Sequence, residues 1–550
     1  MPSINFSLKD LGNLVGKRIS EKELKELLEY AKAEFSGSDG DEVSIQFNDT
    51  NLPYLWSVEG LAILFQGVIG IKKGIPEIKS EKSDYKIIVD RSIRPVRPFI
   101  SAFVAKGGKL NDFFLKQIIQ LQEKFCENFG RRRQKVAIGL YPVSKISFPV
   151  SYSAVPPKSV KFVPLDSSKS LSLAEILEEH PKGREYAWIL KDTKKYPLLC
   201  DANKEILSFP PIINSSTTGK LGIDDCDIFF EATGTDLDSV NLASCIFAHA
   251  LSLRGFSIFS TKISYVGKSL LSPDFSVHQH KLDKKQVESL LGLELKDSDI
   301  KRLLEKARFN VKGSSVEIPC FRNDIMHSVD LVEEIGIMYG FDNISELPLS
   351  NYTVGGTSEI QNYIDKCRDI IVGLGYQEIM SPILTSKEAL IDRMNLKHSL
   401  DVVEISNPAS AGFSVLRSWI LPGLMDVLMK NKHVDFPQKL FEQGLVSVKD
   451  NDSVFDNEHI AGLESHISAN FTKVKQSVDF ILRMCGLDAE YEDFEHNSFI
   501  SGRAAKVIVK NKEVGFVGEF HPAVLTSWGL DMPVAGFEIN LSELFRIIAK

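Results

Sequence analysis

The sequence lacks the marks of several protein classes. No two of its seven cysteines form a Cys-x-x-Cys pair, which argues against a zinc site of the common spacing and favours reduced thiols. The longest apolar stretch, residues 60–71, is too short to cross a bilayer and contains Gln66. The N-terminus has no apolar core of a signal peptide, so we expect a cytoplasmic protein without a membrane partner.

An excess of positive charge is also missing. The 65 lysines and arginines face 73 aspartates and glutamates, which gives a formal net charge of −8. Proteins that bind nucleic acid on their own are usually basic, so any RNA contact requires a local basic patch or a partner subunit. The densest basic run is Arg131-Arg132-Arg133 with Lys135, and a solvated helix end is the simpler explanation for it.

The sequence does contain enough apolar material for several cores. Its hydrophobic fraction of 43% and charged fraction of 25% are typical of globular proteins, and 550 residues suggest about three to four domains. Helical and strand periodicities alternate along the chain, which predicts an α/β (α+β) multidomain fold. The predicted domains are a small α/β module (1–84), a mixed α/β domain (85–271), a winged or helix-turn-helix-like module (272–350) and a larger α/β domain (351–550).

Several elements can be placed from their ends. Capping boxes at Ser20 and Ser172 predict that helices begin there. A helix over residues 111–129 is expected to end at Gly130, a favourable C-cap. Alternating or apolar runs predict strands at 227–233, 402–405, 438–441 and 504–509.

Three acids share one face of a predicted helix. Asp330, Glu333 and Glu334 are spaced i, i+3 and i+4, so their charges repel unless something compensates them. A magnesium ion, which prefers oxygen ligands, would do so. A helix start is the alternative, because Asp330 and Glu333 also form a capping-box pattern and acids are favourable in a first helical turn.

A second polar pair lies on the predicted strand 227–233. Glu231 and Thr233 are two residues apart, so their side chains point to the same face. A carboxylate beside a hydroxyl can hold a water molecule or a hydroxyl group of a ligand. The alternative is that Thr233 only caps the following turn and that Glu231 is a solvated strand residue.

Several blocks, taken together, resemble one family. The run from Pro319 to Glu334, with the segment 339–344 after it, is similar to the signature of phenylalanine–tRNA ligase β subunits. The chain has no room for the extra tRNA-binding domains of the longer bacterial form, so the archaeal or eukaryotic type is favoured. Further similar blocks, in the family's order, lie at 180–187, 210–215, 233–236, 407–408, 416–418, 431–433 and 440–442.

The resemblance implies sites and partners. It implies a magnesium ion, shared with the α subunit, at Asp324, Asp330, Glu333 and Glu334. It implies a pocket for editing Tyr-tRNA(Phe) around Leu199, Ser208, Glu231 and Thr233, with Asn214 and Ser215 nearby. The expected assembly is an α2β2 heterotetramer that binds tRNA(Phe) and uses ATP, with this chain supplying assembly, RNA support and editing.

The C-terminal domain resembles a class II synthetase domain that has lost its catalytic groups. Catalytically active members carry an arginine two residues before a strand glutamate, and this arginine holds the α-phosphate of ATP. In this sequence Leu440 stands two residues before Glu442. The segment 514–518 also lacks the arginine that follows the corresponding glycine-rich strand. Adenylation is therefore expected on the α subunit.

One departure from the family and two other functions remain open. Residues 52–54, Leu-Pro-Tyr, stand where many family members have Arg-Pro-Asp, which puts a polar role of that loop in doubt. A free-standing hydrolase of mischarged tRNA would use the same pocket without an α subunit. A non-enzymatic nucleic-acid-binding scaffold is suggested by residues 272–350, and the net charge of −8 argues against it.

Overall fold

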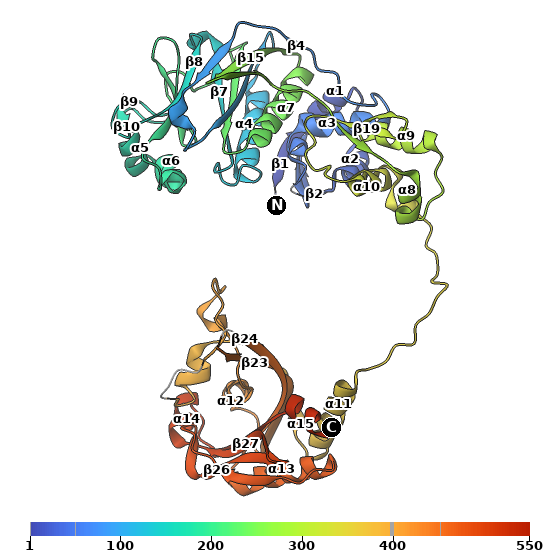
Figure 1. Cartoon of the computed structure of the whole chain (residues 1–550), viewed down its shortest axis with the longest axis vertical. Coiled ribbons are helices and arrows are strands. Elements are labelled where there is room, and N and C mark those ends of the chain that lie inside the picture. Colours follow the sequence, from blue (N-terminus) through green and yellow to red (C-terminus); the bar gives the residue numbers. More distant parts are fainter. Residues whose placement is uncertain (1, 50, 397–400, 452, 550) are drawn as a thin grey trace. The chain divides into compact units, whose positions relative to one another are not determined.

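The computed structural model describes residues 2–49, 51–396, 401–451 and 453–549. The chain divides into two compact units, Met1–Pro348 and Leu349–Lys550, coloured blue to yellow and yellow to red in Figure 1. No helix in the described parts of the chain is long and apolar enough to cross a membrane. The finer borders at 84 and 271 stay predictions.

The first unit begins with a small sheet of strand order β1-β3-β2 beside three helices. The predicted helix start at Ser20 is confirmed for the second of them, where Ser20 Oγ accepts a hydrogen bond from the Glu23 amide, but the Glu23 carboxylate pairs with Lys17 and does not complete the capping box. The Leu-Pro-Tyr run at 52–54 differs from the family pattern. It leads into a buried turn over residues 53–55, so these residues contribute to packing. The elements are β1 (Ser3–Ser7), α1 (Leu8–Val15), α2 (Glu21–Leu28), β2 (Ala33–Asp39), β3 (Glu42–Phe47) and α3 (Val58–Ile69).

A large sheet fills the middle of this unit, with the strand order β13-β12-β11-β8-β5-β15-β6-β14-β7. Alternate residues of β6 and β14 face α4 and α7 on one side and a second apolar cluster on the other. Its strands are β5 (Lys86–Val89), β6 (Phe99–Lys106), β7 (Val136–Pro142), β8 (Val150–Val155), β11 (Tyr196–Cys200), β12 (Ile206–Phe209), β13 (Ile213–Asn214), β14 (Ile228–Gly234) and β15 (Ser257–Tyr265), with β4 (Ser80–Glu81) and β16 (Lys268–Ser272) also paired to β15. The short strands β9 (Lys161–Phe162) and β10 (Leu171–Ser172) form a separate pair.

The helices of this middle part are α4 (Asp112–Glu127), α5 (Leu173–Glu179), α6 (Pro181–Tyr186) and α7 (Leu237–Leu253). The capping box at Ser172 is present, with both of its hydrogen bonds. The predicted end of α4 at Gly130 is wrong. The helix ends at Glu127, and the left-handed residues that follow are Arg131, Arg132 and Arg133 rather than the glycine.

The last part of the first unit combines a sheet of order β17-β19-β18 with three helices. The helix predicted around the three acids is α10. The elements are β17 (His278–Lys281), α8 (Lys284–Leu291), α9 (Asp297–Lys306), β18 (Asn310–Lys312), β19 (Ser315–Ile318) and α10 (Ser328–Tyr339).

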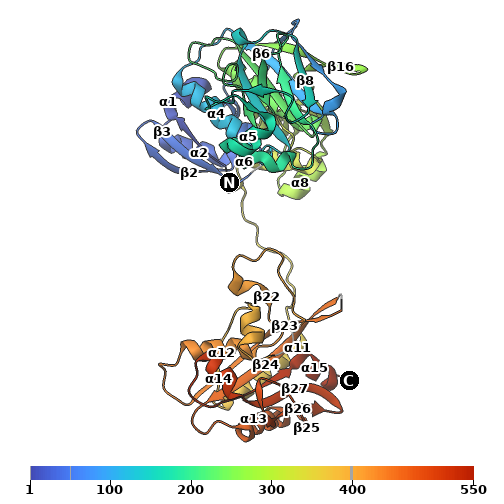
Figure 2. The same cartoon turned by 90° about the vertical axis from the view of Figure 1, so that its left-hand side faces the viewer.

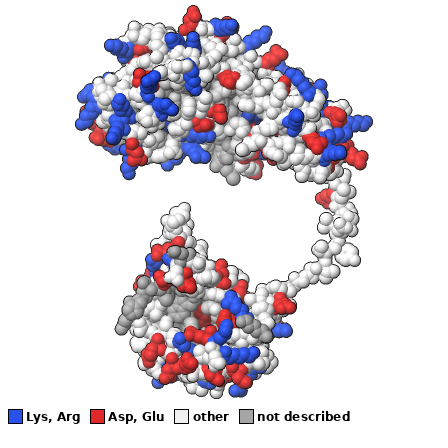
Figure 3. Space-filling view, viewed as in Figure 1, with Lys and Arg blue, Asp and Glu red and all other residues white. Residues whose placement is uncertain are grey.

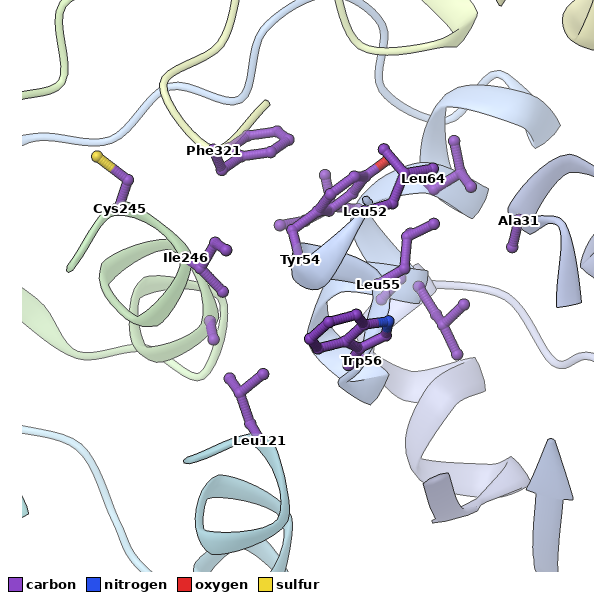
Figure 4. Packing of buried hydrophobic residues seen from close by; sticks show 14 of the residues in the cluster. Ala31, Leu52, Tyr54, Leu55, Trp56, Leu64, Leu121, Cys245, Ile246 and Phe321 are labelled. Atoms are coloured by element: carbon purple, nitrogen blue, oxygen red, sulfur yellow. The ribbon is translucent and has the colours of Figure 1, made fainter. Parts of the chain in front are cut away.

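One apolar core runs through all three parts of this unit. Figure 4 shows Trp56 and Tyr54 of the N-terminal part facing Leu121 of α4 and Ile246 of α7, with Phe321 close to Tyr54. The rings of Tyr54 and Phe321 are 4.9 Å apart. The three parts therefore support one another, because burial of these rings depends on all of them.

The second unit is built on an antiparallel sheet with an added parallel edge strand, in the order β20-β23-β24-β28-β27-β26-β25. Helices α11, α13 and α15 cover one face, and α12 and α14 pack on the other (Figure 2). The helices are α11 (Glu359–Gly373), α12 (Leu421–Lys430), α13 (Phe471–Met484), α14 (Pro522–Trp528) and α15 (Leu541–Ile548).

The strands predicted at 438–441 and 504–509 are confirmed, as parts of longer strands. The strand predicted at 402–405 is wrong, because only a single bridge from Glu404 to Val415 forms there. The strands are β20 (Gln377–Glu378), β21 (Leu384–Thr385), β22 (Val415–Leu416), β23 (Gln438–Asp450), β24 (Ser453–Ser465), β25 (Glu490–Asp493), β26 (Phe499–Val509), β27 (Lys512–Phe520) and β28 (Val534–Asn540).

Candidate functional site

Strand β14 places the predicted polar pair on a buried face of the large sheet. Glu231 lies opposite Gly139 of β7 on one side and Ala102 of β6 on the other. Glu231 is 3% exposed and Thr233 is 0% exposed. The alternative of a solvated strand glutamate is therefore wrong.

The carboxylate of Glu231 is only half satisfied. The Tyr141 hydroxyl lies 3.0 Å from Glu231 Oε1 and 3.3 Å from Asn214 Oδ1. Within the described residues, Glu231 Oε2 has no hydrogen-bond partner. Ser208 Oγ lies beside the Tyr141 hydroxyl without a hydrogen bond of normal geometry. Buried polar atoms are nearly always paired, so an unpaired oxygen here marks a place where a ligand or water can bind.

Burial changes the acid–base behaviour of this group. It raises the pKa of the Glu231 carboxyl to about 7, although the Tyr141 hydrogen bond and the charge of Arg97 act in the opposite direction. Burial also raises the pKa of the Tyr141 hydroxyl well above its usual value, so that Tyr141 stays a neutral donor. Glu231 therefore changes its protonation state close to neutral pH, where a group in a reactive site is most useful.

A buried arginine holds the second member of the pair. Arg97 Nε donates to Thr233 Oγ1 at 3.1 Å, its Nη2 donates to Thr233 O at 2.6 Å, and its Nη1 donates to Gln134 O at 2.9 Å. The Thr233 hydroxyl accepts from Arg97 and lies within hydrogen-bonding reach of the Tyr152 hydroxyl, which donates to Arg97 O at 2.8 Å. The capping alternative is wrong for Thr233, because Asp236 caps α7 through the Ser239 amide.

The other residues of the predicted pocket come from neighbouring strands. Leu199 of β11 pairs with Ser208 of β12, and Ser208 pairs in turn with Asn214 of β13. Leu199 lies in the apolar cluster on the Glu231 face of the sheet. Ser215 is engaged elsewhere, since its hydroxyl is 2.8 Å from that of Thr217. The fold thus gathers Ser208, Asn214 and Glu231 around one hydroxyl.

A glycine leaves the space that the cluster occupies. A Cβ atom at Gly139 would lie 2.5 Å from Glu231 Oε1 and 2.3 Å from the Tyr141 hydroxyl oxygen. Both distances are too short for non-bonded atoms, so a larger residue at position 139 would displace the two side chains. Gly139 therefore belongs to the site through its lack of a side chain.

Two of the four predicted magnesium ligands form ion pairs with an arginine of this chain. Arg322 Nη2 lies 2.5 Å from Asp324 Oδ2 and 2.6 Å from Glu334 Oε1, and all three side chains are buried or nearly so. One guanidinium therefore neutralises the negative charges of Asp324 and Glu334. Both carboxylates already have a cationic partner in this chain.

The other two acids have separate partners. Asp330 Oδ2 accepts from the amides of Met326 and His327, both at 2.7 Å, and so caps α10. Glu333 is 2.8 Å from Lys32 Nζ. Among the described residues, no group of three or more His, Cys, Asp or Glu side chains is arranged to hold a metal ion. The four acids do not fit a magnesium site made by this chain alone.

The second unit also contains a buried glutamate, and there the carboxylate is fully paired. Glu442 Oε1 lies 2.6 Å from Arg417 Nη1 and 3.1 Å from the Ser381 amide, and its Oε2 accepts from the Ser381 hydroxyl at 2.6 Å. Leu440 is buried in the apolar cluster on the same face. This site has no free polar atom on Glu442 with which to bind a nucleotide.

Family models match two stretches of the chain. The model of the tRNA synthetase B5 domain matches residues 280–341, and that of the phenylalanyl tRNA synthetase beta chain CLM domain matches residues 345–541. The phenylalanine–tRNA ligase beta subunit of Pyrococcus horikoshii is 39% identical over 557 residues, which cover 99% of this chain and 100% of the relative. This chain belongs to the family of phenylalanine–tRNA ligase beta subunits.

Other members of the beta subunit family agree. That of Methanocella arvoryzae is 36% identical over 555 residues, which cover 99% of this chain and 100% of the relative. A crystal structure of an N-terminal fragment of the phenylalanyl-tRNA synthetase beta subunit from Pyrococcus horikoshii is 38% identical, with a TM-score of 0.60, and covers 62% of this chain and 99% of the fragment. The predicted family, its archaeal or eukaryotic type and the multidomain α/β fold class are confirmed.

Sequence reasoning missed three residues of this beta subunit's polar cluster. Gly139 and Tyr141 are two residues apart on β7, so the same-face argument that links Glu231 with Thr233 applies to them as well. Only the register between β7 and β14 reveals that the two pairs meet. Arg97 carries no local signal of its role, because it lies in the turn before β6.

Proposed function

We propose that this beta subunit assembles with an alpha subunit into an α2β2 phenylalanine–tRNA ligase and that the Glu231 cluster removes tyrosine from mischarged tRNA(Phe). The complex would join L-phenylalanine to tRNA(Phe) while ATP becomes AMP and pyrophosphate. The observation that carries the editing proposal is the buried Glu231 carboxyl, with a free Oε2 and a pKa raised to about 7.

Discrimination between the two amino acids follows from the free carboxylate oxygen. Phenylalanine and tyrosine differ by one hydroxyl, and a site built to bind that hydroxyl rejects the analogue that lacks it. Tyr141 already makes a phenol–carboxylate bond to Oε1, so the face of the sheet accommodates this pairing. A substrate tyrosine would make the same bond to Oε2, whereas phenylalanine would leave Oε2 buried and unpaired.

The remaining groups suit ester hydrolysis. The Thr233 hydroxyl would turn its hydrogen from Tyr152 to the ester carbonyl oxygen, and the buried Arg97 cation behind it favours the negative charge that develops there. Ser208 Oγ is free to orient the attacking water. In hydrolysis the hydroxyl of the water molecule joins the carbonyl carbon, and the bond between this carbon and the ribose oxygen breaks. The other proton of the water molecule is transferred to the ribose oxygen.

The synthetic reaction is proposed for the alpha subunit. This is supported by Leu440, which supplies no cation for a phosphate, and by Glu442, whose oxygens are bound by Arg417 and Ser381. Pyrophosphate exchange by the isolated beta subunit would contradict this assignment. A cytoplasmic location remains part of the proposal.

The magnesium requirement of the family bears on the acids near α10. Because those acids do not fit a site within this chain, a magnesium ion there requires further ligands from the alpha subunit. Asp324, Asp330, Glu333 and Glu334 therefore remain predicted ligands of a shared ion, which would stabilise the contact between the subunits.

The editing proposal is tested by deacylation of Tyr-tRNA(Phe) by the reconstituted complex. Glu231→Gln keeps the shape of the side chain and a carbonyl oxygen for Tyr141, and removes the charge. We expect it to slow deacylation by about a hundredfold, the loss typical for one charged contact of 2–3 kcal/mol. Charging with phenylalanine is the internal control and should not change. Undiminished deacylation by Glu231→Gln would show that the site lies elsewhere.

A further inference from the structure

The basic segment 131–135 borders the Glu231 cluster directly. Gln134 O accepts a hydrogen bond from Arg97 Nη1 at 2.9 Å, and Lys135 O accepts one from the Thr235 amide at 3.1 Å. On the other side, Arg133 Nη1 donates to Ile212 O at 2.9 Å, two residues before Asn214. The segment is therefore bonded to both chain segments that frame the cluster.

The backbone of this segment is unusual. Arg131, Arg132 and Arg133 have φ values of 50°, 52° and 65°, a left-handed conformation that is unfavourable for residues with a side chain. Their amides donate in order to the carbonyls of Asn128, Glu127 and Cys126 at the end of α4. Strain of this kind is retained where the surroundings fix it, and functional sites are common examples.

The three arginine side chains are used differently. Arg133 is partly buried, and its guanidinium lies 4.3 Å from the centre of the Tyr186 ring. Arg131 and Arg132 are exposed and form no ion pair with any described residue. A helix C-terminus favours a nearby cation, and Arg133 already meets that requirement. The two exposed arginines need another explanation.

An exposed tryptophan completes this surface. The Arg132 guanidinium is 5.9 Å from the ring centre of Trp188, which lies in the turn Ala187–Leu190 and is 43% exposed. Lysines and arginines gather over the end of the unit that carries α5 and α6, although the chain as a whole is acidic (Figure 3). Flat rings and guanidinium groups beside free positive charge are what single-stranded RNA binds, through stacking and phosphate contacts.

We propose that Arg131, Arg132 and Trp188 form the docking surface for the single-stranded 3′ end of the aminoacylated tRNA. The inference rests on the proposed editing function, since the amino acid is esterified to the terminal ribose of that strand. Trp188 and Arg132 stack an unpaired base that precedes the terminal adenosine, and Arg131 binds a backbone phosphate. The hydrogen bonds of Gln134 and Arg133 then hold this surface in register with Glu231 and Asn214.

The first test compares Arg131→Ala/Arg132→Ala with Arg18→Ala in the reconstituted complex. Arg18 is an exposed arginine of the same unit with no side-chain partner among the described residues. The double variant should raise KM for Tyr-tRNA(Phe) about tenfold and leave kcat unchanged, while Arg18→Ala changes neither. The slope of log KM against log salt should fall by about 0.7 for each phosphate that the double variant no longer binds. An unchanged KM and salt slope would overturn the inference.

The second test separates stacking from general damage. Trp188→Ala should raise KM about tenfold, and Trp188→Phe should restore most of the affinity because a ring remains. Arg132→Lys keeps the charge and loses the planar group, so it should fall between wild type and Arg132→Ala. Hydrolysis of the 3′-tyrosyl ester of adenosine, which has no RNA strand, should be unaffected. Equal loss on this small ester would show a purely structural role.

A third measurement distinguishes this inference from the editing proposal. Binding of a hairpin RNA with the acceptor-stem sequence and its 3′ overhang is followed by fluorescence anisotropy, with no chemistry involved. Weaker binding by the variants, in a complex that deacylates nothing, would support the docking surface and reject editing. Normal deacylation with unchanged binding by every variant would support editing and reject the docking surface.

Discussion

Glu231 in the first unit and Glu442 in the second are both buried glutamates on interior strands, and they differ in how fully their carboxylates are paired. Glu442 has partners on both oxygens, including the guanidinium of Arg417. Glu231 has one neutral partner, Tyr141, and one free oxygen. A carboxylate that only supports the fold is fully paired, because an unpaired buried charge is costly. A half-paired carboxylate keeps one oxygen that can accept a hydrogen bond from a ligand.

The comparison also extends to the arginines that lie near the two glutamates. In the second unit the guanidinium of Arg417 forms an ion pair with the Glu442 carboxylate, and Leu440, two residues before it, carries no charge. In the first unit the nearest arginine, Arg97, bonds to Thr233 and leaves Glu231 open. Completeness of pairing therefore separates a glutamate that supports the fold from a candidate reactive group.

The largest expected effect is on the completed site. Arg417→Met leaves Glu442 buried without a cation, and breaking a buried pair in this way costs about 3–5 kcal/mol. Urea unfolding of the beta subunit should show this loss, and Arg417→Met/Glu442→Leu should recover most of it. A single variant as stable as wild type would mean that pairing at Glu442 does not support the fold.

The next effect concerns the space beside Glu231. Gly139→Ala places a Cβ against Glu231 Oε1 and the Tyr141 hydroxyl, so we expect deacylation of Tyr-tRNA(Phe) to fall about 10- to 100-fold. Overpacking should cost no more than about 1–3 kcal/mol of stability. Gly222→Ala, at a glycine with room for a Cβ, is the control. Equal activity of the two variants would show that the cluster tolerates displacement.

A third prediction uses the pKa of Glu231, about 7 in the folded protein against an ordinary 4.5. The group favours folding in its neutral form, so its contribution is full below pH 4.5 and is lost as pH rises through 7, by about 3 kcal/mol in total. Glu231→Gln should remove this part of the pH dependence of unfolding. A wild-type and variant difference that does not change between pH 4 and 8 would contradict the raised pKa.

The same group should control deacylation. Because the ionised carboxylate accepts the substrate phenol, the rate should rise with pH and level off above about 7. Tyr141→Phe removes a hydrogen bond that lowers the pKa of Glu231, so the rise should move to higher pH. A profile that does not move would show that Tyr141 has no influence on the ionisation that limits the rate.

Local pattern predicted part of this site and tertiary register supplied the rest. The shared face of Glu231 and Thr233 follows from the period of a strand, and it is what the structure shows. The meeting of Glu231 with Gly139 and Tyr141 depends on how β7 aligns with β14, which no local pattern encodes. Arg417 is hidden in the same way, because Glu442 lies 25 residues further along the chain.

Helix and strand ends show a similar limit. Gly130 is the natural C-cap by residue type, yet a Cβ there would lie 2.5 Å from both Cys126 O and Val136 O, so the glycine serves close packing and the arginines take the left-handed positions. The predicted strand at 402–405 has the right residue types, but only Glu404 bridges to Val415. Tertiary contacts override propensity at both places.

The smallest expected change in stability tests the same criterion on the acids near α10. Asp324 and Glu334 are paired by Arg322 and resemble Glu442, whereas Glu333 is 54% exposed and has Lys32 as its partner. Loss of an exposed ion pair costs at most about 1 kcal/mol, so Glu333→Gln and Lys32→Met should both unfold close to wild type.

The two variants should differ in the magnesium dependence of assembly if the acids hold a shared ion. Glu333→Gln removes a ligand and should raise the magnesium concentration for half-maximal assembly with the alpha subunit about tenfold or more, since even the loss of an outer-shell partner typically costs 10- to 100-fold. Lys32→Met breaks the same ion pair, together with the one between Lys32 and Asp49, and keeps the ligand, so its midpoint should stay at the wild-type value or fall. Identical midpoints for wild type and Glu333→Gln would leave these acids as caps and ion-pair partners only.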